Sequence, residues 1–157
     1  MTFVKTPGVS AMIDKTDIRI LEVLLSNAKL SYRDIGSRVG VSAATVMTRV
    51  KNLERQGIIL RYSAILDHEK LGYELTAITE ITVSKGKLLE MEQEIAKLPS
   101  VCAVYDTTGL TDAILIAKFK SRQDLSNFTK SLLAMPFVER TNTHLVLTTV
   151  KEDFRLV

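Results

Sequence analysis

Residues 41–57 have the sequence VSAATVMTRVKNLERQG, in which apolar residues recur at helical spacing. Ser42 suits the N-cap position, because its hydroxyl accepts a hydrogen bond from a free N–H group of the first turn. Val46, Val50 and Leu53 then follow at i, i+4 and i+7 and form one apolar stripe. A glycine at position 57 ends the pattern. The segment therefore predicts a helix that buries one face and leaves the opposite face free.

Two shorter helical patterns come before this segment, over about 14–26 and 31–39, and Asp14 and Ser31 are their expected N-caps. Three helices with a tight turn before the third are typical of a helix-turn-helix unit, in which the third helix enters the DNA major groove. Residues 58–66 have a short β-like pattern that predicts a hairpin. The N-terminal part of the chain thus predicts a winged helix-turn-helix, although a plain three-helix packing unit with a basic face fits the same pattern.

The free face of the predicted third helix carries small and basic residues. Ala44 and Thr48 permit close approach to DNA, and threonine can contact a base edge or a thymine methyl group. Lys51 and Arg55, one and two turns further, are better placed for phosphates. Arg49 flanks the apolar stripe, where it can reach a phosphate or a neighbouring carboxylate. The residues expected to contact DNA are Ser42, Ala43, Ala44, Thr45, Thr48, Arg49, Lys51 and Arg55.

The apolar residues of the second half of the chain recur with a different period. Residues 73–83 alternate between two faces with the period of a strand, and a β-α-β-β-α-β order follows from the later patterns. This order predicts an α+β fold of the ferredoxin-like kind, with a four-stranded antiparallel sheet and both helices on one face. Residues 113–117 of the third strand are apolar on both faces. A second subunit is therefore expected to cover the sheet face that lacks helices.

The charge is unevenly distributed along the chain. The whole sequence of 157 residues has a net charge of +3. Up to Tyr62 there are ten Lys and Arg against five Asp and Glu, whereas the remainder has eleven against thirteen. The basic excess in the first part indicates a polyanionic partner. We therefore expect a flexible arm at 1–12, a winged helix-turn-helix DNA-binding domain at 13–62, a linking strand and turn at 63–72, and the ferredoxin-like domain at 73–157.

Several classes of protein are disfavoured by what the sequence lacks. Cys102 is the single cysteine, which excludes an intrachain disulfide and fits a reducing compartment. No apolar run approaches the roughly 18–20 residues that span a bilayer, and the first residues do not have the pattern of a signal peptide. His68 and His144 are isolated from any metal-ligand pattern, and no catalytic motif is present. We expect a cytoplasmic protein with no catalytic residues, no metal and no membrane partner.

The residues at 41–67 resemble the corresponding stretch of the Lrp/AsnC, or feast/famine, regulators. Two further stretches resemble the same family: Ile13-Asp14-Lys-Thr-Asp17, which leads into the first predicted helix, and Leu71-Gly72-Tyr73, which opens the second domain. The resemblance covers about residues 13–153 and implies an N-terminal DNA-binding domain, a linking strand and a ferredoxin-like domain that dimerises and senses small molecules, typically amino acids. It further implies dimers through the sheet faces, rings of four dimers, and an effector at the dimer–dimer contact.

The same resemblance points to an effector loop between the second and third strands. The family usually has Gly-Asp-x-Asp there, and this chain has Gly109-Leu110-Thr111-Asp112, so one acid is missing. Gly109 lets the backbone approach a ligand, and Asp112 can accept hydrogen bonds from an α-ammonium group. The alternative is a plain turn whose aspartate bonds its own backbone. The expected effector residues are Thr108, Gly109, Leu110, Thr111, Asp112 and Thr143.

The function expected from these patterns is sequence-specific transcriptional regulation, modulated by a small molecule such as an amino acid. An RNA-binding module is the first alternative, because its fold shares the β-α-β-β-α-β order. That function needs exposed aromatic residues on the central strands, and the third strand has Phe119 alone. A small-molecule-binding protein or an enzyme built on the ferredoxin-like domain is the other alternative, but no acid/base pair supports catalysis.

Overall fold

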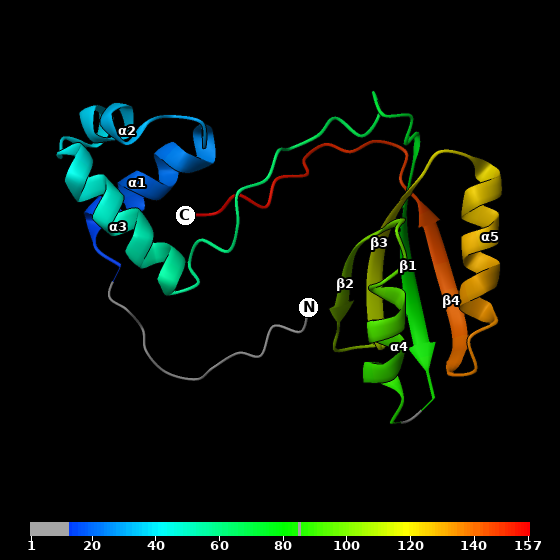
Figure 1. The fold of residues 1–157 in the computed structure, drawn as a ribbon. Coiled ribbons are helices and arrows are strands. Elements are labelled where there is room, and N and C mark those ends of the chain that lie inside the picture. The colour runs from blue at the N-terminus through cyan, green and yellow to red at the C-terminus, as the bar shows by residue number, and fades with distance from the viewer. Residues whose placement is uncertain (1–12, 85) are drawn as a thin grey trace. The chain divides into compact units, whose positions relative to one another are not determined.

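The computed structural model describes residues 13–84 and 86–157, which form two units (Figure 1). One unit contains the residues up to Ile65 together with Asp153–Val157, and the other contains Leu66–Glu152. The division after Ile65 lies inside the expected linking segment 63–72. Residues 153–157 differ from expectation, because they join the N-terminal unit rather than the ferredoxin-like domain. The arm expected at 1–12 lies outside the described residues. No helix in the described part of the chain is long and apolar enough to cross a membrane.

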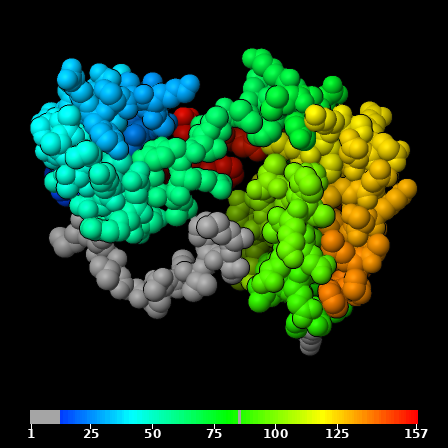
Figure 2. Space-filling view, viewed as in Figure 1, coloured from blue at the N-terminus to red at the C-terminus, as the bar shows by residue number. Residues whose placement is uncertain are grey.

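The N-terminal unit consists of α1 (Lys15–Ser26), α2 (Tyr32–Val39) and α3 (Ala43–Arg55), which Figure 2 shows closely packed on one another. The expected N-caps are confirmed. Asp14 and Ser31 form capping boxes with Asp17 and Asp34, and Ser42 accepts a hydrogen bond from the third N–H group of α3. The apolar stripes meet in a buried core made of Ile20, Ile35, Val39, Val46 and Val50.

Two glycines shape the turn between α2 and α3. Gly40 ends α2 with φ 82°, a left-handed conformation that suits glycine. The N–H groups of Gly40 and Val41 both donate to the carbonyl oxygen of Gly36, at 2.8 and 3.0 Å. Gly36 is buried, and a Cβ atom there would lie 2.5 Å from the carbonyl oxygen of Val41. The absence of a side chain at Gly36 therefore allows the close turn that sets α3 against α2.

The segment after α3 differs from the hairpin expected at 58–66. No strand forms between α3 and β1 in the described residues. The N–H groups of Ile58 and Ile59 donate to the carbonyl oxygen of Leu53 and close the end of α3. Residues 60–67 then run without backbone hydrogen bonds to any other described segment. A β-like pattern needs a neighbouring strand to form a ladder, and this unit offers none.

The second unit is the ferredoxin-like domain, as expected. Its elements are β1 (Leu75–Val83), α4 (Leu88–Ile95), β2 (Val101–Asp106), β3 (Ala113–Phe119), α5 (Arg122–Leu133) and β4 (Val138–Leu145). The sheet order is β2-β3-β1-β4, and all neighbours are antiparallel. Both helices pack on one face, since Met91 and Ile95 of α4 and Phe128 and Leu132 of α5 share a single core with β1 and β3.

The opposite sheet face is partly apolar and has no helix on it. Ile78 of β1 is 36% exposed and Tyr105 of β2 is 44% exposed. By the register, Ile116 of β3 lies directly beside Ile78 on this face. A polar group at the β4 edge interrupts the apolar surface: Asn142 donates to Glu80 Oε2 at 3.0 Å, and His144 Nε2 lies 3.8 Å from Glu80 Oε1. We call this surface the outer sheet face.

Candidate functional site

The free face of α3 presents the residues that the helical pattern places there. Ala43, Ala44, Thr48, Lys51 and Arg55 are exposed, while the apolar stripe on the other side is buried. The hydroxyl of Thr48 donates to the carbonyl oxygen of Ala44 at 3.0 Å, so its oxygen can still accept a hydrogen bond from a partner outside the helix. Lys51 forms no ion pair with the described residues, so its ammonium group is free to meet a phosphate.

Ser42 and Thr45 of the same set are engaged in capping the helix. Ser42 Oγ accepts the N–H of Thr45 at 3.1 Å, and the two hydroxyl oxygens lie 2.9 Å apart. These hydrogen bonds position the first turn of α3. The N-terminal end of a helix also carries free N–H groups and a positive dipole end, which favour an anion such as a phosphate.

Arg49 is held by α1. Its Nη1 atom lies 2.6 Å from Asp14 Oδ2 and 3.0 Å from Asp17 Oδ1. The backbone N–H of Asp17 and then the Arg49 guanidinium hold the pKa of Asp14 below its ordinary value. Of the two partners left open by the sequence, a phosphate or a carboxylate, the structure places Arg49 with carboxylates. The ion pairs join the capping box of α1 to the middle of α3.

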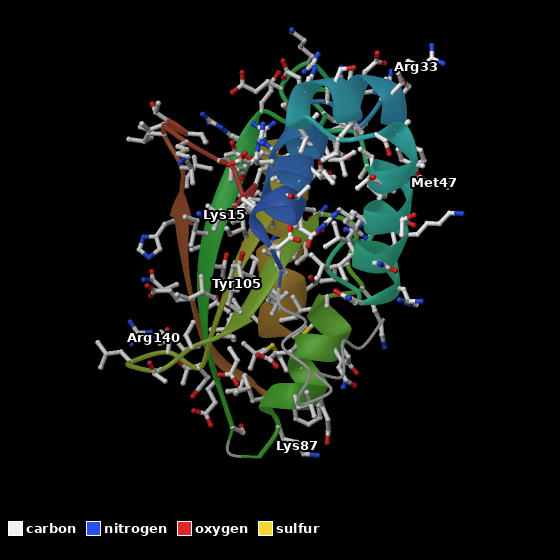
Figure 3. All side chains as sticks on the ribbon, turned by 90° about the vertical axis from the view of Figure 1, so that its left-hand side faces the viewer. Lys15, Arg33, Met47, Lys87, Tyr105 and Arg140 are labelled. Carbon is white, nitrogen blue, oxygen red and sulfur yellow. The ribbon has the colours of Figure 1, made fainter. Side chains whose placement is uncertain are left out.

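Other residues near the free face of α3 are not marked by the sequence pattern as candidates for DNA contact. A groove of about 640 Å³ runs between the start of α1 and α3, and Asn52 and Gln56 line it together with Thr48. Met47 is 39% exposed, and Figure 3 shows Met47 and Arg33 projecting away from the helices. A methionine beside the apolar stripe suggests the core, so the sequence pattern alone does not mark Met47 as exposed. Exposure of Arg33 follows from its place opposite the apolar positions of α2.

The expected effector loop closes over the end of β1. The N–H of Asp112 donates to the carbonyl oxygen of Ile81 at 2.9 Å, and Asp112 Oδ2 accepts the N–H of Val83 at 2.8 Å. Within the loop, the hydroxyl of Thr107 donates to the carbonyl oxygen of Thr111 at 3.2 Å. Asp112 thus forms hydrogen bonds with backbone groups, as the alternative of a plain turn predicts. These groups belong to β1, however, and not to the loop itself.

The remaining expected effector residues fall into two places. Thr108, Gly109 and Leu110 form the exposed tip of the loop, and the Leu110 side chain is as exposed as in an extended peptide. Thr143 lies in β4 and is not in the loop. Its hydroxyl is 3.1 Å from that of Thr79, a residue buried on the helix-covered face. The structure therefore brings 108–112 together and gives Thr143 a partner elsewhere in the sheet.

Residues 76–156 match the Lrp/AsnC ligand binding domain, and residues 13–59 match a winged helix-turn-helix DNA-binding domain. A relative from Pyrococcus furiosus, described as an uncharacterized HTH-type transcriptional regulator, is 48% identical over 144 residues, covering 92% of this chain and 97% of the relative. The similarity therefore extends over both domains and the segment that joins them.

Solved structures agree with this assignment. A transcriptional regulator from Neisseria meningitidis in complex with L-Met has a TM-score of 0.85 and 32% identity, over 92% of this chain and 96% of that one. AsnC of E. coli has the same fold with a TM-score of 0.85 at 24% identity, over 92% and 99% of the two chains. The chain therefore belongs to the Lrp/AsnC family of transcriptional regulators, with a helix-turn-helix DNA-binding domain followed by a ligand-binding domain.

Proposed function

We propose that α3 is the recognition helix and that a dimer places two copies of it in successive major grooves, about 34 Å apart. The observation that carries this proposal is the division of α3 into a buried stripe and an exposed face of small and basic residues. Ala44 and Thr48 face the bases, and Lys51 and Arg55 contact phosphates. Arg49 orients α3 through Asp14 and Asp17 and leaves phosphate binding to its neighbours.

Selection of bound duplexes from a random-sequence library, followed by affinity measurements at several salt concentrations, tests this assignment. Thr48→Ala changes the preferred base at one position of the selected site. Lys51→Ala weakens binding to all sequences and lowers the slope of log affinity against log salt by about 1. Lys97→Ala is the matched control, because Lys97 is an exposed lysine of the other unit. Wild-type affinity and slope in both α3 variants would refute the assignment, and preference for single-stranded RNA would favour the alternative function.

We propose further that a second copy of the chain covers the outer sheet face. Ile78 and Tyr105 are exposed there in the single chain, and contiguous apolar surface on a protein marks an interaction site. Four such dimers, joined in a ring through a second and separate contact, make the assembly of four dimers that the family resemblance implies. Glu80, Asn142 and His144 bond one another within the chain. They give the pairing a defined register, because a register that broke these bonds at the interface would leave polar groups unsatisfied.

Sedimentation measurements test this contact. Ile116→Glu places a charge in the outer sheet face, so the variant should sediment as a monomer at micromolar concentration. Leu133→Glu is the control, because Leu133 is 53% exposed on α5. A wild-type protein that is already monomeric would contradict the proposal. A mass of eight chains would support the ring of dimers, and a mass of two would limit the assembly to the dimer.

We propose that a small molecule such as an amino acid binds at the tip of the β2–β3 loop, at a contact between subunits. The regulator from Neisseria meningitidis was solved with L-Met, and the exposed Leu110 is the side chain of this loop most available to a neighbour. Asp112 holds the loop against β1, so its role in the proposed site is to fix the conformation of the loop. Leu110 replaces an acid at this position, which favours an effector with an apolar side chain.

A thermal-shift screen of the twenty amino acids tests this site, because a ligand at 100 times its Kd stabilises the folded state by about 2.7 kcal/mol. At least one amino acid should raise the melting temperature, and Leu110→Ala should reduce that rise. Leu89→Ala is the control, since Leu89 is 67% exposed on α4 and remote in sequence from the loop. No shift with any amino acid would exclude this effector class.

We propose that the protein acts by binding alone, without catalysis, in the cytoplasm. A regulator of this family works where chromosomal DNA is accessible, and its partners are then double-stranded DNA, a second copy of itself and an effector. Assembly and effector binding are reciprocally linked when the effector lies at a subunit contact.

A further inference from the structure

The C-terminal segment after β4 connects the two units a second time. The chain leaves the N-terminal unit at Ile65 and returns to it at Asp153. The N–H of Val146 donates to the carbonyl oxygen of Thr76 and extends the β1–β4 pairing by one bond. Leu147 and Val150 are then each 95% exposed. These exposed side chains make little contact with the rest of the protein. The segment after β4 is therefore held mainly by the residues near its end.

One end is fastened by an unusual lysine. Lys118 of β3 is 8% exposed, and it is the single buried charged residue in the described part of the chain. Its ammonium nitrogen lies 2.9 Å from Glu152 Oε2 and 3.4 Å from Thr76 Oγ1. A buried cation that loses its partner is strongly destabilising, because its desolvation is no longer compensated. Lys118 therefore holds Glu152 with a specificity that exposed pairs such as Lys70–Asp67 lack.

The other end docks on the DNA-binding unit. Asp153 accepts hydrogen bonds from Arg155 Nε at 2.8 Å and Nη2 at 2.9 Å and so orients the guanidinium. Arg155 Nη1 then lies 3.3 Å from the carbonyl oxygen of Leu25, in the last turn of α1. The final carbonyl groups of a helix have no partner within it and form its negative end. No basic residue lies in the last turn of α1, so Arg155 supplies the missing cation.

We propose that residues 146–157 form a latch, fastened at Lys118 by Glu152 and at α1 by Arg155, which restricts the freedom of the DNA-binding unit. This inference rests on the proposed binding of DNA by a dimer. With the latch closed, each DNA-binding unit is tethered at two points of the chain, and the second half-site is met at a higher effective concentration. With the latch open, only residues 58–66 tether the unit, and binding to two half-sites loses this advantage.

The experiment measures affinity for two duplexes by fluorescence anisotropy. One duplex carries the two half-sites selected by the wild-type protein, and the other has one half-site randomised. Glu152→Gln removes the carboxylate that fastens the latch at Lys118. Calorimetry of the variant separates a loss of sheet stability, caused by an unpaired Lys118, from a loss of DNA affinity. The variant should weaken binding to the two-half-site duplex by about fivefold or more, a typical coupling between sites. Its affinity for the single half-site should remain that of the wild type.

The two ends of the latch should be equivalent. Arg155→Gln should produce the same loss as Glu152→Gln, and the double variant should lose no more than either alone, because one open end already frees the segment. Lys118→Arg should keep wild-type affinity, since arginine retains the ion pair. Lys70→Met, which removes an exposed ion pair, is the control. Additive losses in the double variant, or wild-type affinity in both single variants, would overturn the latch. Failure of the wild type to bind any duplex more tightly than random DNA would instead refute the proposed DNA-binding function.

Discussion

Replacement of Gly36 by alanine tests whether the α2–α3 turn depends on the missing side chain. The new Cβ atom would stand 2.5 Å from the carbonyl oxygen of Val41 and 3.4 Å from the backbone nitrogen of Ala43. Both atoms belong to the backbone of the turn, so they cannot move aside as the end of a flexible side chain could. Relief of the overlap requires α3 to shift relative to α2.

The expected magnitude comes from two opposed effects. Alanine is a better helix residue than glycine by about 1 kcal/mol, which alone would stabilise α2. Inserting an atom into a well-packed region costs about 1–3 kcal/mol, and contact with rigid backbone argues for the upper end. The difference is a net loss of about 2 kcal/mol. For a unit of this size that loss corresponds to a fall in melting temperature of about 10 °C.

Calorimetry of the full chain measures the stability, and anisotropy with selected duplex DNA measures the function. Gly36→Ala should lower both the melting temperature of the N-terminal unit and the DNA affinity. Ser37→Ala is the control on the same helix, and it should be neutral or slightly stabilising because Ser37 is exposed. A Gly36→Ala protein as stable as the wild type, or more so, would show that helix propensity outweighs the overlap and would refute the reasoning.

Three further outcomes are expected. Arg49→Met should lower the melting temperature of the N-terminal unit, because it leaves Asp14 and Asp17 unpaired, yet leave the salt slope of DNA binding unchanged; a smaller slope would make Arg49 a phosphate contact. The lowered pKa of Asp14 means that its carboxylate stabilises the fold above its unfolded pKa of 3.8 and that this stability is lost as the pH falls through the folded value. Acid unfolding followed by circular dichroism should therefore be less steep below about pH 4 in Asp14→Asn, and an unchanged curve would contradict this. Burial first, and then the hydrogen bond to Glu54, raises the pKa of Tyr62 to about 12. The neutral phenol therefore stabilises the fold below pH 10, and this stabilisation is lost as the pH rises through 12. Ultraviolet titration should show one tyrosine that ionises at higher pH than the others, and this step should be absent in Tyr62→Phe.

The parts of this fold that depend on residues close together in the sequence are mostly predictable from it. The N-caps Asp14, Ser31 and Ser42 are each followed by the residues that complete a first turn, so the starts of the three helices are predictable. The strand order also follows from alternation and spacing. The extended segment after α3 is different, because its apolar pattern is the same whether or not another strand lies beside it.

The features that were not predictable depend on partners distant in sequence. Arg49 is 35 residues from Asp14, and Asp112 is 29 residues from Val83. Either side chain, taken with its neighbours alone, fits a ligand contact as well as a structural one. The role of Glu152 was hidden for the same reason, since its partner Lys118 looks like a polar residue near the end of an apolar strand.

The return of the C-terminus to α1 affects how the protein can be divided. The DNA-binding unit is discontinuous in the sequence, so a fragment that stops at Ile65 lacks the arginine that satisfies the carbonyl end of α1. Exchange of DNA-binding units between two relatives would need two grafts, one that ends near Ile65 and one that begins near Asp153. A purification tag added after Val157 would sit beside the DNA-binding helices rather than on the sensing domain, and a tag at that end is therefore the wrong choice for binding assays.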